Sequence, residues 1–438
     1  MRMDRRTFIG GAAASGLVAG TNALRVPGVA RAQDPATAPP IGAGGKPMAP
    51  AELAAVADRI GDGDPLALID LAAVDRNIAT ITGFAASRGW AARPALKAFR
   101  CPELSRYVLE RLPQPRGMVF DLGEVDELVR IGPANLDLLM GWAPTPAELA
   151  TFLAKAPPVR RPHRVRLLVE SVDSARELAR LSASTRRALP LDVALDLDSG
   201  MGRGGIDSKA EMKAMLDALR GAGDRLRLGA VVCYDGQTSL VSPGPARRVI
   251  VEQARIWLRR ALGWLHELGA DLLGDRPLIV NGPGSVSFRK WPAGSEITEI
   301  SPGNAFVFPS ALDGFDTEGL SSAIVLCAPV SRVTSDSPSV PLTQTTLPGS
   351  AKEEILVKSG AWTAISAIAT AVWPDGISSD TASGGLNAYV VPKGSRKRGE
   401  HILLRPVESW FAIDGFDALH AVRERQLVRT WPTLRRWG

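Results

Sequence analysis

Lys97 is the residue with the clearest chemical potential in the chain. It lies in ARPALKAFRCPE at 92–103, where a strand-like segment ends at a proline and a helix follows. A lysine amine forms an imine with an aldehyde when burial or a neighbouring positive charge lowers its pKa. Arg93 and Arg100 are expected to supply that charge. Spacing alone also fits a solvated surface lysine, so the chemistry of Lys97 depends on its surroundings.

Arg203 is a second candidate, in the segment DLDSGMGRGGI at 196–206. A glycine-rich turn after a strand lets the backbone approach a ligand, while the arginine presents a cation to it. The alternative is a tight turn with a surface arginine. Both readings place Arg203 just beyond the end of a strand.

The elements that position these residues alternate between short apolar runs and amphipathic segments of helix length from residue 61 to 308. This alternation is typical of parallel βα units. Because no GxGxxG follows the first strand, a (β/α)8 TIM barrel of α/β class is favoured over an open dinucleotide-binding sheet. Catalytic residues of a barrel lie at the carboxyl ends of its strands. The predicted strands are 66–70, the segment ending at Lys97, 118–122, 136–140, 165–170, 191–198, 228–235 and 278–281.

Residues 309–438 have a different sequence pattern, without the alternation of strand-like and helix-like segments. β-prone runs such as SAIVLCAPVSRVT and LNAYVVP are separated by clusters of Gly, Pro and Ser. We therefore expect a smaller, mostly β C-terminal domain after the barrel.

The amino terminus reads as a targeting segment. The Arg5–Arg6 pair precedes an apolar stretch, and Ala30-Arg31-Ala32 provides a small-x-small cleavage site, which together indicate a twin-arginine signal peptide over 1–32. The alternative is an uncleaved or membrane-anchored terminus. Residues 33–60, rich in Pro, Ala and Gly, are expected to be a flexible lead-in. The body is thus expected to be periplasmic or secreted, with no membrane segment after the signal is removed.

Charge and cysteine content exclude several classes of protein. The formal net charge is +6, but residues 1–32 hold five arginines against one aspartate, so four of these charges leave with the signal. The sequence contains no basic patch with interleaved aromatic residues, the pattern that would predict nucleic-acid binding. The three cysteines, which are too few and too scattered for a disulfide framework, are expected to be small buried apolar residues. They are Cys101, Cys233 and Cys327.

The segment from residue 66 to 99 resembles the opening of alanine-racemase-type proteins that depend on pyridoxal 5'-phosphate (PLP), the fold-type III enzymes, and especially their D-threonine aldolase and D-serine dehydratase branch. The resemblance includes an Arg-Pro-x-x-Lys segment whose lysine binds the cofactor, which implies that Lys97 binds PLP. The segment at 196–206 resembles the family's Asp-x-Gly-Met-x-Arg-x-Gly motif, which implies that Arg203 lies in the same site. The resemblance extends loosely over nearly the whole mature chain.

Two further segments match that family. CYDG at 233–236 resembles its Tyr-x-Gly segment, which implies that Tyr234 contacts the cofactor. NGPGSVSF at 281–288 is similar to the glycine-rich loop that holds the cofactor phosphate. Backbone and hydroxyl donors to the phosphate are then expected from Gly282, Gly284 and Ser285.

The chain also departs from that branch, whose aldolases and dehydratases hold a divalent metal on a His-x-Cys pair. In the corresponding positions this sequence has Glu408 and Trp410, and Ala95 replaces a histidine of the lysine segment. His163, His266, His401 and His420 show no ligand spacing, so no metal residue is predicted. A carboxylate-based site involving Glu408 or Asp414 stays open.

Three functions follow from the resemblance. The first is a PLP-dependent lyase that acts at Cα of a D-amino acid, such as a 3-hydroxy one. The second is a metal-independent racemase, an isomerase that needs an acid or base on each face of Cα; Lys97 serves one face and Tyr389 is the candidate for the other. The third is a non-catalytic PLP-binding protein, which would not need a second domain. A homodimer is the expected assembly and a small amino acid the expected substrate.

Overall fold

The computed structural model describes residues 45–155, 163–184, 190–241, 244–273, 277–334, 352–358, 369–373, 377–378 and 386–434. They all belong to one compact unit, Pro39–Gly438. The predicted signal peptide at 1–32 lies outside the described residues. Among the helices that are described, none combines the length and the apolar character that crossing a membrane requires.

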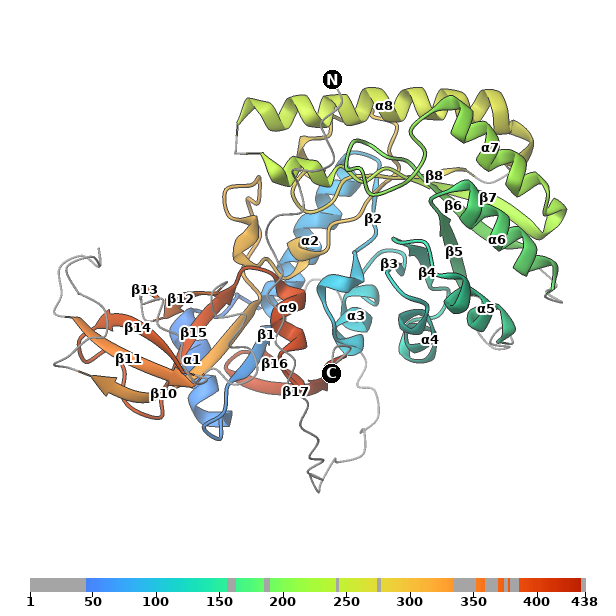
Figure 1. The fold of residues 1–438 in the computed structure, drawn as a ribbon. Helices are drawn as coiled ribbons and strands as arrows, with labels where there is room; N and C mark the ends of the chain where they lie inside the picture. The colour runs from blue at the N-terminus through green and yellow to red at the C-terminus, as the bar shows by residue number, and fades with distance from the viewer. Residues whose placement is uncertain are drawn as a thin grey trace. The chain divides into compact units, whose positions relative to one another are not determined.

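Eight parallel strands form the predicted barrel (Figure 1). Neighbouring strands pair in the order β2-β9-β8-β7-β6-β5-β4-β3, and a parallel bridge between Ala95 and Met118 closes the ring. The α/β barrel expected from the alternating pattern is therefore confirmed. The strands are β2 Ala91–Ala92, β3 Arg116–Val119, β4 Asp137–Met140, β5 Arg164–Val169, β6 Leu191–Asp196, β7 Leu226–Val232, β8 Ile279–Asn281 and β9 Glu299–Ile300.

Helices follow the barrel strands, and Figure 1 shows α4 to α7 on the outside of the ring. Four of them begin where a side-chain oxygen accepts the backbone N–H three residues later, the caps being Asp121, Thr145, Ser171 and Ser208. Such a cap stabilises a helix start by about 1 kcal/mol. The helices are α2 Leu71–Ser87, α3 Pro102–Leu109, α4 Leu122–Ile131, α5 Pro146–Ala154, α6 Val172–Ala183, α7 Lys209–Arg220 and α8 Pro245–Gly269.

The second part of the molecule is a nine-stranded sheet with the order β13-β14-β11-β10-β1-β16-β17, in which β15 pairs with β10 and β12. It confirms the smaller, mostly β domain. Two helices belong to this part, α1 Pro50–Ile60 and α9 Ser409–Asp414. The strands are β1 Leu66–Asp70, β10 Ile324–Thr334, β11 Lys352–Lys358, β12 Ala369–Trp373, β13 Ile377–Ser378, β14 Leu386–Pro392, β15 His401–Pro406, β16 Ala418–Arg423 and β17 Gln426–Pro432.

Strand β1 corrects the predicted strand inventory. Residues 66–70 form the expected strand, but it pairs antiparallel with β10 and parallel with β16, so it belongs to the second sheet. Its five residues are all buried, and a run that is apolar on both faces fits the interior of either sheet. The eighth barrel strand is instead β9, a two-residue strand that the sequence pattern did not indicate.

Helix α1 corrects the last part of the flexible lead-in predicted for 33–60, of which residues 33–44 lie outside the described residues. Pro50 occupies its first turn, and the Glu52 carboxylate accepts the Ala49 N–H, which are both ordinary signals of a helix start. Leu53 and Val56 are buried, and α1 contacts β15. The Ala and Pro content suggested a linker. Residues 50–60 instead form an amphipathic helix that helps to cover the second sheet.

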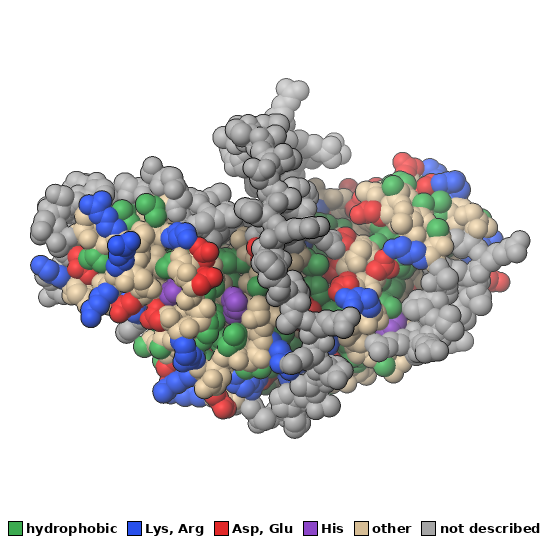
Figure 2. Space-filling model, turned by 90° about the horizontal axis from the view of Figure 1, so that it is seen from below, with side chains coloured by type: hydrophobic (Ala, Val, Ile, Leu, Met, Phe, Trp, Pro, Cys, Tyr) green, Lys and Arg blue, Asp and Glu red, His purple; other side chains and the backbone are tan. Residues whose placement is uncertain are grey.

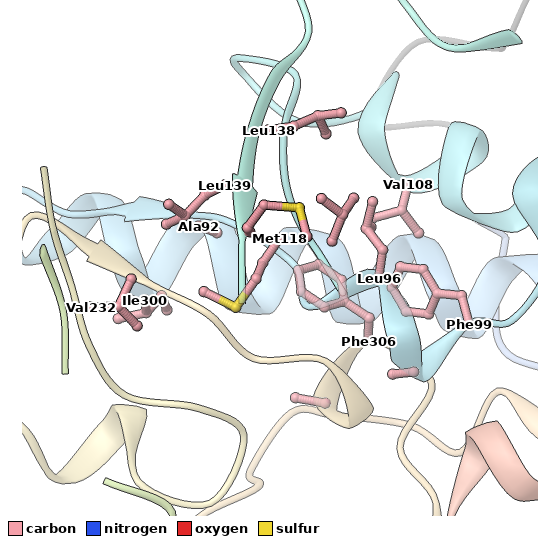
Figure 3. Packing of buried hydrophobic residues seen from close by; sticks show 14 of the residues in the cluster. Ala92, Leu96, Phe99, Val108, Met118, Leu138, Leu139, Val232, Ile300 and Phe306 are labelled. Carbon is pink, nitrogen blue, oxygen red and sulfur yellow. The ribbon is translucent and has the colours of Figure 1, made fainter. Parts of the chain in front are cut away.

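The barrel core anchors the lysine segment. Lys97 lies in a short 3-10 helix, η1 Leu96–Ala98. Leu96 and Phe99 on either side of it are completely buried, and Figure 3 shows both among the apolar side chains of the core. Phe99 meets Phe306 edge to face, with ring centroids 6.1 Å apart. Two buried neighbours thus fix the backbone from which Lys97 projects.

An ionic cluster fills part of the barrel interior. Arg93 is completely buried; its Nε lies 2.6 Å from Glu299 Oε2, and its Nη1 lies 3.0 Å from Asp137 Oδ1. Arg116 also contacts Glu299. Burial alone would raise the pKa of the Glu299 carboxyl, but Arg93 and Arg116 hold it below its ordinary value. Arg93 is therefore committed to the barrel interior.

The cysteines and the surface agree with the sequence. Cys101, Cys233 and Cys327 are free and buried, as expected.

On the face that Figure 2 shows, the described Lys and Arg side chains lie among Asp and Glu side chains. That face therefore presents no single-sign field to a charged partner.

Candidate active site

The chemically distinctive residues follow the carboxyl ends of the barrel strands. Because these ends meet at one mouth of a barrel, residues far apart in the sequence converge there. Lys97 follows β2, Arg203 follows β6, Tyr234 follows β7 and Ser285 follows β8. The structure thus places four of the predicted site residues at the same mouth.

Lys97 sits in an apolar, partly enclosed position. Its Nζ lies 4.4 Å from the centroid of the Phe120 ring and 5.1 Å from that of Trp142. These aromatic residues follow β3 and β4 and meet edge to face at 5.2 Å. Burial, together with the charge of Arg203, lowers the pKa of the Lys97 amine to about 8, although Glu408 opposes the shift. Sequence reasoning missed both aromatic residues, whose only signal is their place just after a strand.

The positive charge that acts on Lys97 comes from a different residue than predicted. Arg93 pairs with Glu299 in the barrel interior, and Arg100 Nε donates to Asp414 Oδ1 at 2.8 Å. Arg203, more than a hundred residues away in the sequence, lowers the pKa of Lys97 instead. Each predicted arginine has a carboxylate partner that neutralises it.

We predict that Lys97 reacts with amine reagents with a midpoint near pH 8, because only the neutral amine is nucleophilic. Below that pH the reaction should slow in proportion to the protonated fraction. Pulse labelling of the cofactor-free protein over a pH series, read by peptide mass spectrometry, measures the midpoint. Lys213, exposed on α7, is the internal control for reagent access. A Lys97 midpoint near the ordinary value of a lysine amine would contradict the predicted environment.

Arg203 projects from a glycine-rich turn, as expected. Asp198 Oδ1 accepts the N–H of Gly200 at 2.9 Å and that of Gly202 at 3.0 Å, and both glycines have positive φ. These contacts hold the turn in a shape that side-chain-bearing residues adopt poorly. Arg203 Cζ lies 5.9 Å from the centre of the Tyr234 ring. The cation and the phenol therefore face one another across the mouth.

Tyr234 is confined between two glycines. A Cβ at Gly236 would lie 2.3 Å from Tyr234 Cε1, and one at Gly284 would lie 2.8 Å from Cε2. Neither glycine has positive φ, so the need for glycine at both positions is one of space. The ring is 41% exposed, so it forms part of the open surface of the mouth.

Substituting Gly284→Ala should displace the Tyr234 ring and weaken PLP binding about tenfold, since overpacking costs about 1–3 kcal/mol. Titration of the cofactor-free variant with PLP measures the affinity. Gly83→Ala is the matched control, because nothing lies within 4 Å of the added Cβ on exposed α2. An unchanged affinity in Gly284→Ala would show that the ring position does not matter for binding.

The loop 281–288 uses its glycines differently from the prediction. The Gly282 N–H donates to Glu299 O at 3.2 Å. It is therefore not free to bind a phosphate. A Cβ at Gly282 would also meet Ile297 Cγ2 at 2.8 Å. Gly282 and Gly284 both leave space for their neighbours, and the backbone donor predicted at Gly282 is corrected.

Ser285 keeps a donor available. Its Oγ accepts the backbone N–H groups of Gly303 at 3.0 Å and Ala305 at 3.1 Å. Its hydroxyl proton has no acceptor among the described residues, so it can serve an anion at the mouth. Ser285 therefore retains the hydroxyl donor predicted for the phosphate loop.

Asp235 is a supporting residue that sequence reasoning missed. It is completely buried; its Oδ1 accepts from Ser287 Oγ at 2.6 Å and its Oδ2 from Trp291 Nε1 at 2.9 Å. Burial raises the pKa of its carboxyl, and these donors oppose the shift. Asp235 thereby joins the Tyr234 segment to the glycine-rich loop. Its only signal in the sequence is its place next to Tyr234.

A second group of acids lies at the ends of β5 and β6. Burial and repulsion from Glu170 and Asp198 raise the pKa of the Asp196 carboxyl to about 7. Within the part of the chain that the structure describes, no three His, Cys, Asp or Glu side chains are arranged to hold a metal ion. The prediction about metal use stays a prediction.

Tyr389 is separated from the mouth by burial. It lies on β14, where it pairs with Ile355 of β11 and Ser378 of β13. The side chain is completely buried, and its hydroxyl has no hydrogen-bond partner among the described residues. Burial raises the pKa of the phenol to about 12. A hydroxyl enclosed in the second sheet cannot touch a substrate, so the structure lends its predicted catalytic role no support.

Comparison with known proteins places this mouth in context. The family model of the alanine racemase N-terminal domain matches residues 69–306. A D-threonine aldolase from an Arthrobacter species is 26% identical over 263 residues, which are 55% of this chain. The match spans only 62% of that relative's length.

Two solved structures share the architecture of both domains. D-threonine aldolase from Filomicrobium marinum has a TM-score of 0.68 at 20% identity, over 84% of this chain and 94% of that one. D-threo-3-hydroxyaspartate dehydratase from Delftia sp. HT23 has a TM-score of 0.68 at 19% identity, over 85% of this chain and 98% of that one. Because the family model covers more than half of the chain, this protein belongs to the alanine racemase N-terminal domain family, the fold-type III group whose members use PLP, with a D-threonine aldolase-like architecture.

Proposed function

We propose that this protein is a PLP-dependent lyase that acts at Cα of D-amino acids with a 3-hydroxyl group. The observation that carries the proposal is the setting of Lys97, a half-enclosed amine with a pKa of about 8 at the barrel mouth. Around it are Phe120, Trp142 and the cation of Arg203. The aldolase and the dehydratase of similar architecture support the reaction class.

The residues at the mouth fit PLP. Lys97 has the lowered pKa that an imine-forming lysine requires. Ser285 has an uncommitted hydroxyl proton for a phosphate oxygen, and Arg203 offers a cation. Gly284 leaves no room for a Cβ, so the Tyr234 ring lies directly against the loop. When bound, PLP supplies an electron sink for the charge that develops at Cα.

The chain itself supplies binding, orientation and proton transfer. Lys97 Nζ serves at one face of Cα, as the base in its neutral form and as the acid once it is protonated. Arg203 holds an anionic group of the ligand by charge, and Tyr234 bounds the mouth on the side of β7. Phe120 and Trp142 reduce the water around Nζ, which sustains its low pKa.

The racemase alternative has less support. It needs a second acid or base on the face of Cα opposite Lys97, and Tyr389, its candidate, is enclosed in the second sheet. A non-catalytic PLP-binding protein is also less favoured, because α9 of the second domain contacts the η1 segment that holds Lys97. A carrier needs no such contact.

The experiment that tests the proposal is a screen of D- and L-amino acids with the PLP-loaded protein, with and without a metal chelator. Cleavage or dehydration of D-3-hydroxy amino acids is the expected result. Chelator-resistant interconversion of enantiomers would replace the lyase by the racemase. A protein that binds PLP and converts no amino acid would be the non-catalytic alternative.

Export and assembly are separate proposals. We propose that a twin-arginine signal at 1–32 directs the folded body to the periplasm or the exterior, on the basis of Arg5, Arg6 and the cleavage motif. Fractionation of cells that produce the full chain tests it.

We also propose a homodimer, since Trp142 and Leu240 are 53% and 64% exposed although both are large and apolar. Sedimentation measures the assembly.

A further inference from the structure

Glu408 brings a carboxylate from the second domain to the lysine segment. It directly precedes α9 without a side-chain capping bond, and its Oε2 accepts from Asn304 Nδ2 at 2.6 Å. The neighbouring Ser409 Oγ lies 2.7 Å from the carbonyl oxygen of Ala98 and 2.9 Å from Asn304 Oδ1. Ala98 directly follows Lys97 in η1, so these contacts fix Glu408 against the segment that holds the lysine.

The charge of Glu408 acts on two residues at the mouth, Lys97 and Tyr234. Among the described residues it forms no salt bridge, and its Oε1 makes no hydrogen bond. It opposes the lowering of the pKa of Lys97. Loss of hydration, Asp235 and Glu408 together raise the pKa of the Tyr234 phenol, and Arg203 opposes them. Asn304 therefore holds one carboxylate oxygen in place, while the other oxygen has no hydrogen-bond partner among the described residues and is available to accept a proton.

We propose that Glu408 is a catalytic residue that accepts the proton of the substrate's 3-hydroxyl group. This inference rests on the proposed function. As the Cα–Cβ bond breaks, the hydroxyl proton passes to Glu408 and the O–H electron pair forms the C=O bond of the aldehyde product. The electron pair of the broken bond stays at Cα, which is then protonated to give the shorter amino acid. The proton on Glu408 returns to water.

Glu408 and Lys97 have different roles in the proposed reaction. In the proposed function Lys97 moves the proton at Cα. A second base is therefore needed only for a substrate whose 3-hydroxyl group must lose its proton. Asn304 keeps the carboxylate oriented without neutralising it, since an amide carries no net charge. A base of this kind contributes about 10²–10⁴-fold to a rate.

The test compares Glu408→Gln with wild type, both loaded with PLP and in chelator. Glutamine preserves the shape and can still contact Asn304, but it cannot accept a proton. We expect kcat for cleavage of D-threonine to fall about 10²–10³-fold. Deuterium exchange at Cα of D-alanine, which has no hydroxyl, should change less than about threefold on the same scale. Glu318→Gln removes an exposed carboxylate with no side-chain contact among the described residues, and should match wild type in both assays.

A second readout needs neither cofactor nor turnover. Removing the negative charge of Glu408 should lower the midpoint pH at which Lys97 is labelled in the cofactor-free protein, because Glu408 raises the pKa of that amine. Glu318→Gln should leave the midpoint unchanged. If Glu408→Gln proves unstable, Glu408→Ala with added formate is the substitute, and recovery of D-threonine cleavage is expected.

Several outcomes would overturn the inference. Equal losses on D-threonine and D-alanine would indicate a positioning role only. Retained cleavage in Glu408→Gln, or an unchanged Lys97 midpoint, would remove the base role. Loss of wild-type cleavage in chelator would show that cleavage depends on a metal ion, which would remove the metal-free base role. Failure of the proposed function is distinguishable, because wild type would then bind PLP and exchange D-alanine while leaving D-threonine intact.

Discussion

Lys97→Ala should abolish the absorbance band of lysine-bound PLP and lower turnover of any amino acid by at least about 10³-fold. The methyl side chain can neither form the imine nor move a proton at Cα, and each of these roles alone contributes strongly to the rate. The absorbance spectrum of the purified variant after incubation with PLP measures the first effect. Steady-state kinetics on the substrate found in the screen measures the second.

Two controls make that result specific. Lys213→Ala removes an exposed lysine of α7 and should leave both the spectrum and the kinetics unchanged. Lys97→Arg keeps a positive charge near Phe120 and Trp142 but cannot form an imine, so it should behave like the alanine variant. An intact band in Lys97→Ala would remove the PLP assignment from this lysine.

Arg93→Met should have the largest effect on stability, lowering the free energy of unfolding by about 3–5 kcal/mol. The arginine is completely buried, and its removal leaves Glu299, whose side chain is 1% exposed, without its bidentate partner in the barrel interior. Urea unfolding followed by circular dichroism measures the loss. Activity at a temperature well below the transition should change far less.

The double variant Arg93→Met, Glu299→Leu separates charge burial from packing. Replacing both partners by apolar residues should recover much of the stability, because the cost in the single variant comes from the stranded carboxylate. Arg130→Met, which breaks an exposed pair with Glu127 on α4, should change stability by less than about 1 kcal/mol. A small loss in Arg93→Met itself would mean that Arg116 and water compensate for the charge.

The sequence predicted the barrel because its strands are apolar runs spaced by amphipathic helices, and that pattern survives in most of the eight strands. It did not place β1, since LALID is buried on both faces and would suit either sheet. It also missed β9, because two residues are too few to form a pattern. Neighbouring strands in a ring depend on long-range pairing that local periodicity does not encode.

Site residues that belong to a sequence motif were predicted, and site residues whose position depends on tertiary packing were missed. Lys97, Arg203, Tyr234 and Ser285 reach the mouth because each follows a strand, which the order of elements already indicated. The source of the positive charge near Lys97 was wrong because Arg93 and Arg100 pair with partners distant in the sequence. Tyr389 lies in β14, whose five central residues are all buried, so its burial follows from a sheet that forms only on folding.

The place of β1 between β10 and β16 has consequences for how the chain acquires its structure. Leu66 pairs with Cys327, more than 250 positions later, and Ala67 pairs with Leu419, more than 350 positions later. Strand β1 therefore cannot complete its pairing until these distant residues have been synthesised. Such pairings have high contact order and are slow to form. During synthesis one edge of β1 stays unpaired until β10 emerges and the other until β16 emerges, which favours aggregation or chaperone capture. A barrel cut out at residue 308 would keep that exposed strand permanently.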